Sequence, residues 1–477
     1  MNRKPILVLL LLVSLTSAAQ DKIAQFTTLM DTLATRQDFS GCVLVAENGR
    51  PVFQKALGYA DRDKKIPIQL STRFELASVS KQFTAMAIMQ LKEKGKLQYE
   101  DSLRQYFPAL PFPGVTIRHL LNQTSGIPEF LSWTQAQVDT TKINFNADIM
   151  EQLPKVYHNT LFKPGTAFSY SNTNYLLLAQ IIEKVSGEKF ANYLQKYVFR
   201  PAGMKNTLVY SRRSALKPIP DYALSYTWDA GANKFLDPDS TIANYNSFYM
   251  DGVAGPYGIC SNVADMLQWD QALYSEQLVK QSTLQEAFTP FKLPNGQNAG
   301  LAEGLDYGFG WVLSYDSAKG RNIWHNGGYD GYNTVIARYT DKNKTLIILS
   351  NIDQLNNSMS IIPALDNILW YGALNIPPIT TRQHGIRVAP EVLAPLAGIY
   401  TVSNNPFLKM RITVSGSRIY AQYTNQSAFP IYASATGDFF YTVVAARIKF
   451  SRDANGKPNK LTLYQNGQEI EMNRDAE

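Results

Sequence analysis

Residues 74–95 read FELASVSKQFTAMAIMQLKEKG, and they decide how the rest of the chain is interpreted. An extended segment, residues 73–76, leads into a stretch from Ser78 to residue 94 whose periodicity predicts an amphipathic helix. The residues on its apolar face, and the glycine that stops it, are Phe83, Ala87, Leu91 and Gly95. The pattern therefore places a serine at the first turn of a long helix.

Ser78 and Lys81 have the spacing S-x-x-K, which suits nucleophilic catalysis. A serine hydroxyl needs a nearby base at neutral pH, and a lysine supplies one if its pKa is lowered by burial or positive charge. Three residues apart on a helix, both side chains lie on the same face. The alternative is that Ser78 only caps the helix and Lys81 is a solvated surface charge.

The same spacing occurs twice more, and the sequence context separates the three cases. Ser186…Lys189 falls at a helix end beside a glycine, and Ser214…Lys217 lies in a loop that leads into prolines. Ser78 alone follows an extended segment and opens a long helix. We therefore take Ser78 as the candidate nucleophile.

Two further motifs contain residues that fit acid–base and substrate-binding roles. Tyr170 and Asn172 form Y-x-N just before a predicted helix, where the alternative role is loop packing and helix capping. The same spacing begins at Tyr157, Tyr423 and Tyr464. His325, Gly327 and Gly328 follow a predicted strand, where glycines allow close backbone approach. The alternative for His325 is a purely structural role.

Together and in this order, the three motifs resemble the serine β-lactamase and penicillin-binding family. The closest group contains class C β-lactamases, D-alanyl-D-alanine carboxypeptidases, D-amino-acid peptidases and esterases. The resemblance covers roughly residues 22–375 and includes the segments at 118–127, 203–207, 258–269 and 307–311. It also favours Tyr170 over Tyr157.

The resemblance implies a role for each matching residue. Ser78 would be the acylated nucleophile, and Lys81 would accept its proton. Tyr170 would share in acid–base catalysis, particularly at the leaving group. Asn172 would bind the acyl-side amide of the substrate. The backbone N–H groups of Ser78 and Gly328 would form the oxyanion hole.

The third motif departs from the class C β-lactamases. There it is Lys-Thr-Gly, which presents a cation and a hydroxyl to the substrate carboxylate, whereas here it is His325-Asn326-Gly327. The permanent cation is absent, which favours the esterase and peptidase branches over efficient β-lactam hydrolysis.

The strand and helix patterns predict a mixed α/β (α+β) fold. Strands near both ends of residues 20–380 suggest one antiparallel sheet flanked by helices, with a large helical insert, as in the β-lactamase/transpeptidase fold. Asn48-Gly49 predicts a hairpin within it. Residues 390–477 contain strand patterns alone and resemble a small lipocalin-like β-barrel. We expect this module either to be a packing domain without a ligand or to bind a ligand.

Composition and charge exclude several other functions. The chain has 477 residues and a net charge of +7 from 46 basic and 39 acidic residues, which are scattered rather than clustered. We expect no nucleic-acid partner. Four histidines without ligand spacing predict no metal, and no cofactor motif is present. Cys42 and Cys260 are expected as buried thiols, with a disulfide as the alternative.

Residues 1–19 have the pattern of a cleavable signal peptide. A basic start precedes an apolar run, Ile6 to Leu15, which ends at small residues up to Ala19. The residue directly after the expected cut is Gln20 rather than a cysteine, and no later stretch is apolar enough to span a bilayer. The mature chain is therefore expected to be periplasmic or secreted, without a lipid anchor.

The sequence predicts an exported serine hydrolase that acts through an acyl-enzyme on ester or amide bonds. Cell-wall peptides ending in D-amino acids, β-lactams and simple esters are all candidate substrates. The alternative is a protein on the same scaffold that captures penicillins or peptidoglycan fragments without turnover. Stereochemical preference and oligomeric state stay open.

Overall fold

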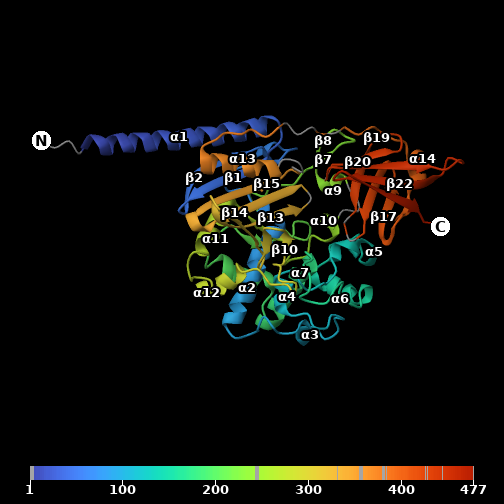
Figure 1. The fold of residues 1–477 in the computed structure, drawn as a ribbon, viewed down its shortest axis with the longest axis horizontal. Helices are drawn as coiled ribbons and strands as arrows, with labels where there is room; N and C mark the ends of the chain where they lie inside the picture. Colours follow the sequence, from blue (N-terminus) through green and yellow to red (C-terminus); the bar gives the residue numbers. More distant parts are fainter. Residues whose placement is uncertain are drawn as a thin grey trace.

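A computed structural model describes residues 5–241, 246–329, 331–353, 358–378, 382, 384–424, 426, 428–442 and 444–475. A large α/β body comprises most of the chain, and an all-β barrel follows at the C-terminal end (Figure 1). The predicted fold class, mixed α/β with a C-terminal barrel, is confirmed.

The centre of the α/β body is an eight-stranded antiparallel sheet. In spatial order its strands are β10 (Gly300–Ala302), β11 (Leu305–Tyr307), β12 (Val312–Asp316), β13 (Gly320–Tyr329), β14 (Tyr332–Tyr339), β15 (Lys344–Ser350), β1 (Gly41–Glu47) and β2 (Arg50–Leu57). Gly41 pairs with Ser350, so a strand near the start of this body pairs with a strand near its end. The β1–β2 hairpin turns at Asn48 and Gly49, whose φ values of 50° and 71° suit a tight hairpin turn.

Helices cover both faces of the sheet, which explains the continuous apolar character of its central strands. In β1, Val43 and Val45 face helices α1 (Pro5–Thr35) and α13 (Ser358–Tyr371). Leu44 and Ala46 alternate with them and face the larger core on the opposite side. Figure 1 shows α1 and α13 along one side of the sheet, with the larger helical region on the other.

That helical region is the predicted insert between the outer strands. Its main helices are α2 (Lys81–Glu93), α4 (Ile117–Leu121), α6 (Asn146–Val156), α7 (Asn172–Ser186), α8 (Phe190–Leu194), α11 (Val263–Ala272) and α12 (Gln281–Ala287). A small three-stranded sheet is made of β5 (Phe74–Glu75), β9 (Ile259–Ser261) and β6 (Leu208–Val209). β5 is followed by the turn that leads into α2. Two short turns, η1 (Ala77–Ser80) and η2 (Phe130–Ser132), carry residues discussed below.

The C-terminal module is a closed eight-stranded antiparallel barrel. Its strands are β16 (Gly398–Val402), β17 (Asn405–Ser415), β18 (Arg418–Tyr423), β19 (Phe429–Ala435), β20 (Asp438–Tyr441), β21 (Ala446–Arg452), β22 (Pro458–Gln465) and β23 (Gln468–Arg474). Pairing of β16 with β23 closes it. Tyr400, Phe439 and Phe450 pack together in its core, with ring centroids 5.6 Å apart in both contacts.

Two expectations from the sequence concern the N-terminal region and the cysteines. The predicted processing point after Ala19 lies within α1, which runs from Pro5 to Thr35. Within the described part of the chain, we find no helix with the length and apolar character needed to cross a membrane. Cys42 and Cys260 are both buried free thiols, as expected.

Candidate active site

The turn that carries Ser78 is held in place by two neighbouring strands. Leu76 N donates to Ile259 O at 2.8 Å, and Leu76 O accepts from Thr334 Oγ1 at 2.7 Å. Ala77 then has a φ of +50°, a left-handed conformation that disfavours residues with a Cβ. This bend places Ser78 in the 3₁₀ turn η1, so α2 begins three residues later than the sequence pattern predicted.

Lys81 is fully buried, and its amine contacts the nucleophile candidate directly. Nζ lies 3.1 Å from Ser78 Oγ, 2.7 Å from Asn172 Oδ1 and 3.0 Å from Pro256 O. Burial lowers the pKa of Lys81 to about 7, and the negative charge of Glu129 offsets part of that effect. A large share of the amine is therefore unprotonated near neutral pH, with a lone pair beside the hydroxyl.

Tyr170 lies two residues before α7, close to the amine of Lys81. Its ring centroid is 4.9 Å from Lys81 Nζ, and its hydroxyl is hydrogen-bonded to Ser78. Burial raises the pKa of Tyr170, and the bond to Ser78 offsets part of that rise. The phenol therefore keeps its proton at neutral pH. Because α7 begins at Asn172, this residue contacts Lys81 from the first helical position.

His325 lies behind Tyr170 rather than at an open surface. It is 3% exposed, and its ring centroid is 6.2 Å from that of Tyr170. Nδ1 is 2.6 Å from Asn326 O, which can only accept, so Nδ1 carries the proton and Nε2 accepts from Tyr307 Oη at 3.1 Å. Burial, followed by the charge of Lys81, lowers the pKa of His325 to about 3. The imidazole is therefore neutral, and it adds no cation to the site.

Gly327 and Gly328 lie on β13 beside the turn that carries Ser78. A Cβ at Gly327 would be 2.3 Å from Leu76 O and 2.5 Å from Thr334 Oγ1, whereas a Cβ at Gly328 would meet no described atom within 4 Å. From the sequence, both glycines are predicted to let a substrate approach the strand. At Gly327 the close contact with the turn is itself a sufficient reason for glycine.

This contact gives a stability prediction. We expect Gly327→Ala to lower the free energy of unfolding by about 1–3 kcal/mol, because the added methyl group pushes the turn away from β13. Gly328→Ala is the matched control, and we expect its effect on stability to stay below about 1 kcal/mol. Urea denaturation measures both, and equal stability of the two variants would contradict the packing argument.

The other two S-x-x-K spacings lack this arrangement. Ser186 Oγ donates to Ile182 O at 2.6 Å, and Ser214 Oγ donates to Ser211 Oγ at 2.6 Å. Both serines thus bond within their own local segment, as the sequence context indicated. Within the described ranges, no cluster of three or more His, Cys, Asp or Glu side chains is arranged to hold a metal ion.

Comparison with known proteins matches this geometry to a family. A family model described as Beta-lactamase matches residues 26–367, more than half of the chain. The chain belongs to the beta-lactamase family. Penicillin-binding protein 4* of Bacillus subtilis (strain 168) is 36% identical over 456 residues, which are 95% of this chain and 99% of that protein.

The fold of this beta-lactamase family member is also similar to those of solved structures. A penicillin binding protein from Bacillus halodurans is 27% identical with a TM-score of 0.61, over 71% of this chain and 98% of that chain. A structure of SurE is 20% identical with a TM-score of 0.62, over 96% and 100% of the two chains. The likeness of fold therefore includes the C-terminal barrel, and the family match supports a serine hydrolase.

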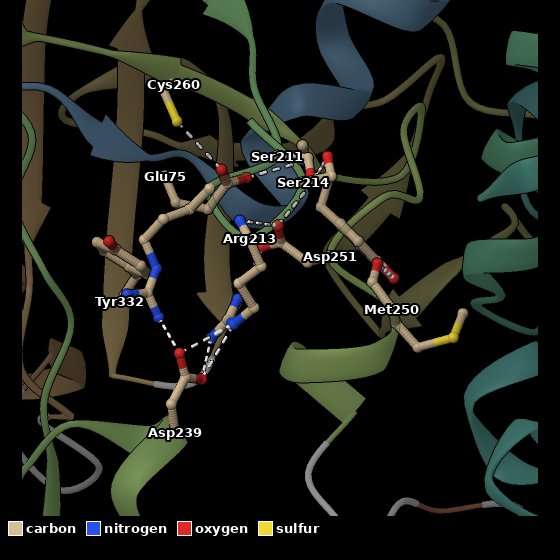
Figure 2. A network of polar contacts seen from close by, with 12 residues as sticks. Glu75, Ser211, Arg213, Ser214, Asp239, Met250, Asp251, Cys260 and Tyr332 are labelled. Carbon is tan, nitrogen blue, oxygen red and sulfur yellow. Dashed lines mark hydrogen bonds and ion pairs between the residues drawn. The ribbon is translucent and has the colours of Figure 1, made fainter. Parts of the chain in front are cut away.

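A buried carboxyl lies behind the turn that carries Ser78 in this beta-lactamase family member. Figure 2 shows Glu75 facing Cys260, whose Sγ lies 3.3 Å from Oε2, while Gly258 N donates to Oε1 at 2.9 Å. Burial raises the pKa of Glu75 to about 8, although both hydrogen bonds act against this rise. Glu75 is therefore mostly protonated at neutral pH, and it supports the turn without adding charge.

Sequence analysis missed one residue of the site, Glu129. Its Oε2 accepts from Asn172 N at 2.6 Å, and its Oε1 accepts from Leu131 N at 3.1 Å. Its charge acts on Lys81 and on Tyr170. The signal that was available is its position directly after the family-like segment 118–127, but no motif spacing relates it to the other site residues.

Proposed function

We propose that the chain is a serine hydrolase that cleaves ester or amide bonds through an acyl-enzyme, with Ser78 as nucleophile. The observation that carries this proposal is the position of Lys81 Nζ, 3.1 Å from Ser78 Oγ in a buried setting. A hydroxyl beside a partly neutral amine loses its proton at low cost. Membership of the beta-lactamase family supports the same chemistry.

The proposed reaction follows from these contacts. Ser78 Oγ attacks the carbonyl carbon as its proton passes to Lys81 Nζ, and backbone N–H groups of Ser78 and Gly328 stabilise the oxyanion. When the bond to the leaving group breaks, that group takes a proton delivered through Tyr170. Water then attacks the acyl carbon as Lys81 and Tyr170 take its proton, and this proton passes to Ser78 Oγ when the bond between Oγ and the acyl carbon breaks. Asn172 holds the acyl-side amide.

The neutral His325 bears on the substrate class. Without a cation at the third motif, the site lacks the group that receives a β-lactam carboxylate in class C β-lactamases. We therefore place esters and amides, including D-amino-acid peptides, ahead of β-lactams as substrates for turnover. The name of the Bacillus subtilis relative supports acylation by penicillin, so the alternative function is stoichiometric capture of penicillin or peptidoglycan fragments.

One experiment separates these functions. The protein is treated with a fluorescent fluorophosphonate and with a fluorescent penicillin, and the adduct is mapped by mass spectrometry. Label on Ser78 from either probe is the expected result, and turnover of nitrophenyl esters identifies the hydrolase. A long-lived penicillin adduct without product release identifies the capture protein, and absence of label at Ser78 overturns both.

We also propose export through residues 1–19, with cleavage after Ala19, and a division into residues 20–380 and 390–477. The apolar run at Ile6 to Leu15 supports the first proposal. Expression in a bacterium, followed by N-terminal sequencing of the extracytoplasmic fraction, tests it. A mature protein that begins at Gln20 is the expected result.

The low pKa of Lys81 gives a pH prediction. Only the neutral amine accepts a proton, so kcat/KM for a neutral nitrophenyl ester should rise with pH through about 7 and then level off. His325 has a pKa of about 3, so its titration does not change kcat/KM above pH 5. Rates are measured from pH 5 to 10 after subtraction of the Ser78→Ala background. A midpoint near the ordinary lysine value would contradict the assignment.

A further inference from the structure

A pocket of about 230 Å³ lies where the C-terminal barrel meets the α/β body. On the side of the body it is lined by the turn of a hairpin formed by β7 (Thr227–Asp229) and β8 (Lys234–Leu236). Residues 386–388, which lead into the barrel, and the strands β18, β19 and β20 line the rest. Figure 1 shows β7 and β8 next to β19 and β20. The lining contains none of the candidate active-site residues, so the pocket is a separate feature.

The pocket lies where two strands of the barrel separate. The last pair that joins β18 to β19 on this side is Ile419 with Ile431. β18 nevertheless begins one residue earlier, at Arg418, and β19 continues to Ala435. Arg418 and Ala433, on the two sides of this opening, both line the pocket. The pocket therefore extends from the surface toward the interior of the barrel.

The inner part of the lining is apolar. Its members all belong to the buried core of the barrel, and they are Leu393, Ile419, Ile431, Ala433 and Phe439. A purely polar solute would leave this surface in contact with water, whereas an apolar chain would cover it. The inner part of the pocket thus favours a ligand with a hydrocarbon portion.

The outer part of the lining has an excess of positive charge. Its charged residues are Arg387, Arg418 and Asp229. Arg418 Nη2 lies 3.9 Å from Asp229 Oδ2, which is too far for a hydrogen bond, and the Arg418 side chain is 40% exposed. Arg387 is exposed as well. Both guanidinium groups therefore keep N–H donors for an anion.

Two tyrosines complete the polar part of the lining. Burial raises the pKa of Tyr420 and of Tyr432, so both phenols keep their protons and can donate to an anion. The charge of Arg418 and a hydrogen bond from it act against the rise at Tyr420. The charge of Asp353 also acts on Tyr432, although two arginines outside the lining act on that carboxyl in turn.

Backbone hydrogen bonds hold the walls of the pocket together. Gly385 N donates to Ala230 O at 3.0 Å, and Ile386 N donates to Ala433 O at 2.8 Å. The segment that leads into the barrel is thus bonded to the hairpin turn and to β19. Asp229 Oδ1 accepts from Ala232 N at 2.7 Å, which fixes the turn itself. A preformed pocket binds a ligand without a large loss of chain entropy.

We propose that this pocket binds a small amphiphilic carboxylate, whose anionic group contacts Arg418 and Arg387 and whose hydrocarbon chain lies against the apolar inner lining. Arginine presents paired N–H donors that match the two oxygens of a carboxylate. The volume lies below the range of about 300–1,000 Å³ typical of pockets for drug-sized ligands, so a ligand of the size of octanoate is expected. This inference goes beyond the proposed hydrolase function and does not depend on it.

Calorimetric titration of the full-length protein tests the ligand class. We expect octanoate to bind at least tenfold more tightly than octanamide, which has the same chain without the charge. Acetate and inorganic phosphate, which lack the chain, should also bind at least tenfold more weakly. Equal affinity for octanoate and octanamide would leave only an apolar pocket, equal affinity for octanoate and phosphate only an anion site, and either result would overturn the inference.

Variants of the charged lining residues test the location. Arg418→Gln should lower the affinity for octanoate at least tenfold. Asp229→Asn keeps an acceptor for Ala232 N but removes the negative charge beside Arg418, so it should raise the affinity at least twofold. Arg447→Gln, at an exposed arginine of β21 outside the lining, is the matched control and should bind as the wild type does.

Binding of octanoate at the candidate active site is the competing explanation. Arg418→Gln leaves that site intact, so unchanged binding in this variant would place the ligand elsewhere and overturn the inference. If Arg418→Gln does not fold, Ala232→Trp replaces it, because this exposed turn residue can fill the pocket without altering the barrel core. Loss of octanoate binding in a folded Ala232→Trp protein is the expected result, and unchanged binding would contradict the proposal. Ser78→Ala should bind octanoate as the wild type does, whether or not the chain is a hydrolase.

Discussion

Replacing Ser78 by alanine is expected to lower turnover by about 10⁴-fold or more while the fold stays intact. The residual rate comes from binding and from the oxyanion donors, which the substitution leaves in place. Stability should change little, because Ser78 is only half-buried and Lys81 keeps its bonds to Asn172 and Pro256. Ester hydrolysis and thermal melting measure the two effects.

Ser80 offers a matched control for this substitution. It lies in the same 3₁₀ turn, and its Oγ is buried without a hydrogen-bond partner among the residues described. Ser80→Ala should therefore keep turnover within a few-fold of the wild type. A folded Ser78→Ala protein with wild-type turnover would disprove the assignment of the nucleophile.

Replacing Lys81 by arginine is expected to lower kcat/KM by about 10²–10⁴-fold, the usual range for loss of general-base catalysis. Arginine keeps the positive charge and the donor groups, but it does not lose its proton in proteins. The variant therefore separates a base from a purely electrostatic role. We expect the rate of Ser78 labelling by a neutral fluorophosphonate to fall in parallel.

Two companion variants make this result interpretable. Lys81→Met removes both charge and base, and it should also cost about 1–3 kcal/mol because Asn172 Oδ1 and Pro256 O lose a buried donor. Lys189→Met, at the exposed second S-x-x-K, should leave kinetics unchanged. Near-normal labelling in a folded Lys81→Arg protein would remove the lysine from the proton-transfer scheme.

Local patterns made much of the fold predictable. The β1–β2 hairpin follows from Asn48-Gly49, and the barrel follows from its regular alternation of strands and turns. What local patterns could not supply is long-range pairing. Closure of the barrel depends on the register between β16 and β23, which no short stretch of sequence encodes.

In the candidate site, too, features set by neighbouring residues were predictable, whereas features set by distant segments were not. Ser78 and Lys81 were predictable because they are three residues apart and because their sequence context differs from that of the other two S-x-x-K spacings. The left-handed conformation of Ala77 had no signal, since alanine rarely adopts it and only the surrounding strands impose it. Glu129 was missed because its contact with α7 joins residues 43 positions apart.

The position of β1 in the central sheet, between β2 and β15, governs when this molecule becomes competent during its synthesis. Until residues 344–350 have been made, β1 lacks its neighbour on one side, and so does β14. β14 contains Thr334, whose hydroxyl holds the turn that carries Ser78. If the chain is the proposed hydrolase, we expect activity to emerge only after about residue 350, when the last strand of the central sheet has been made. We expect a stop codon before residue 350 to leave an inert fragment rather than a weakened enzyme.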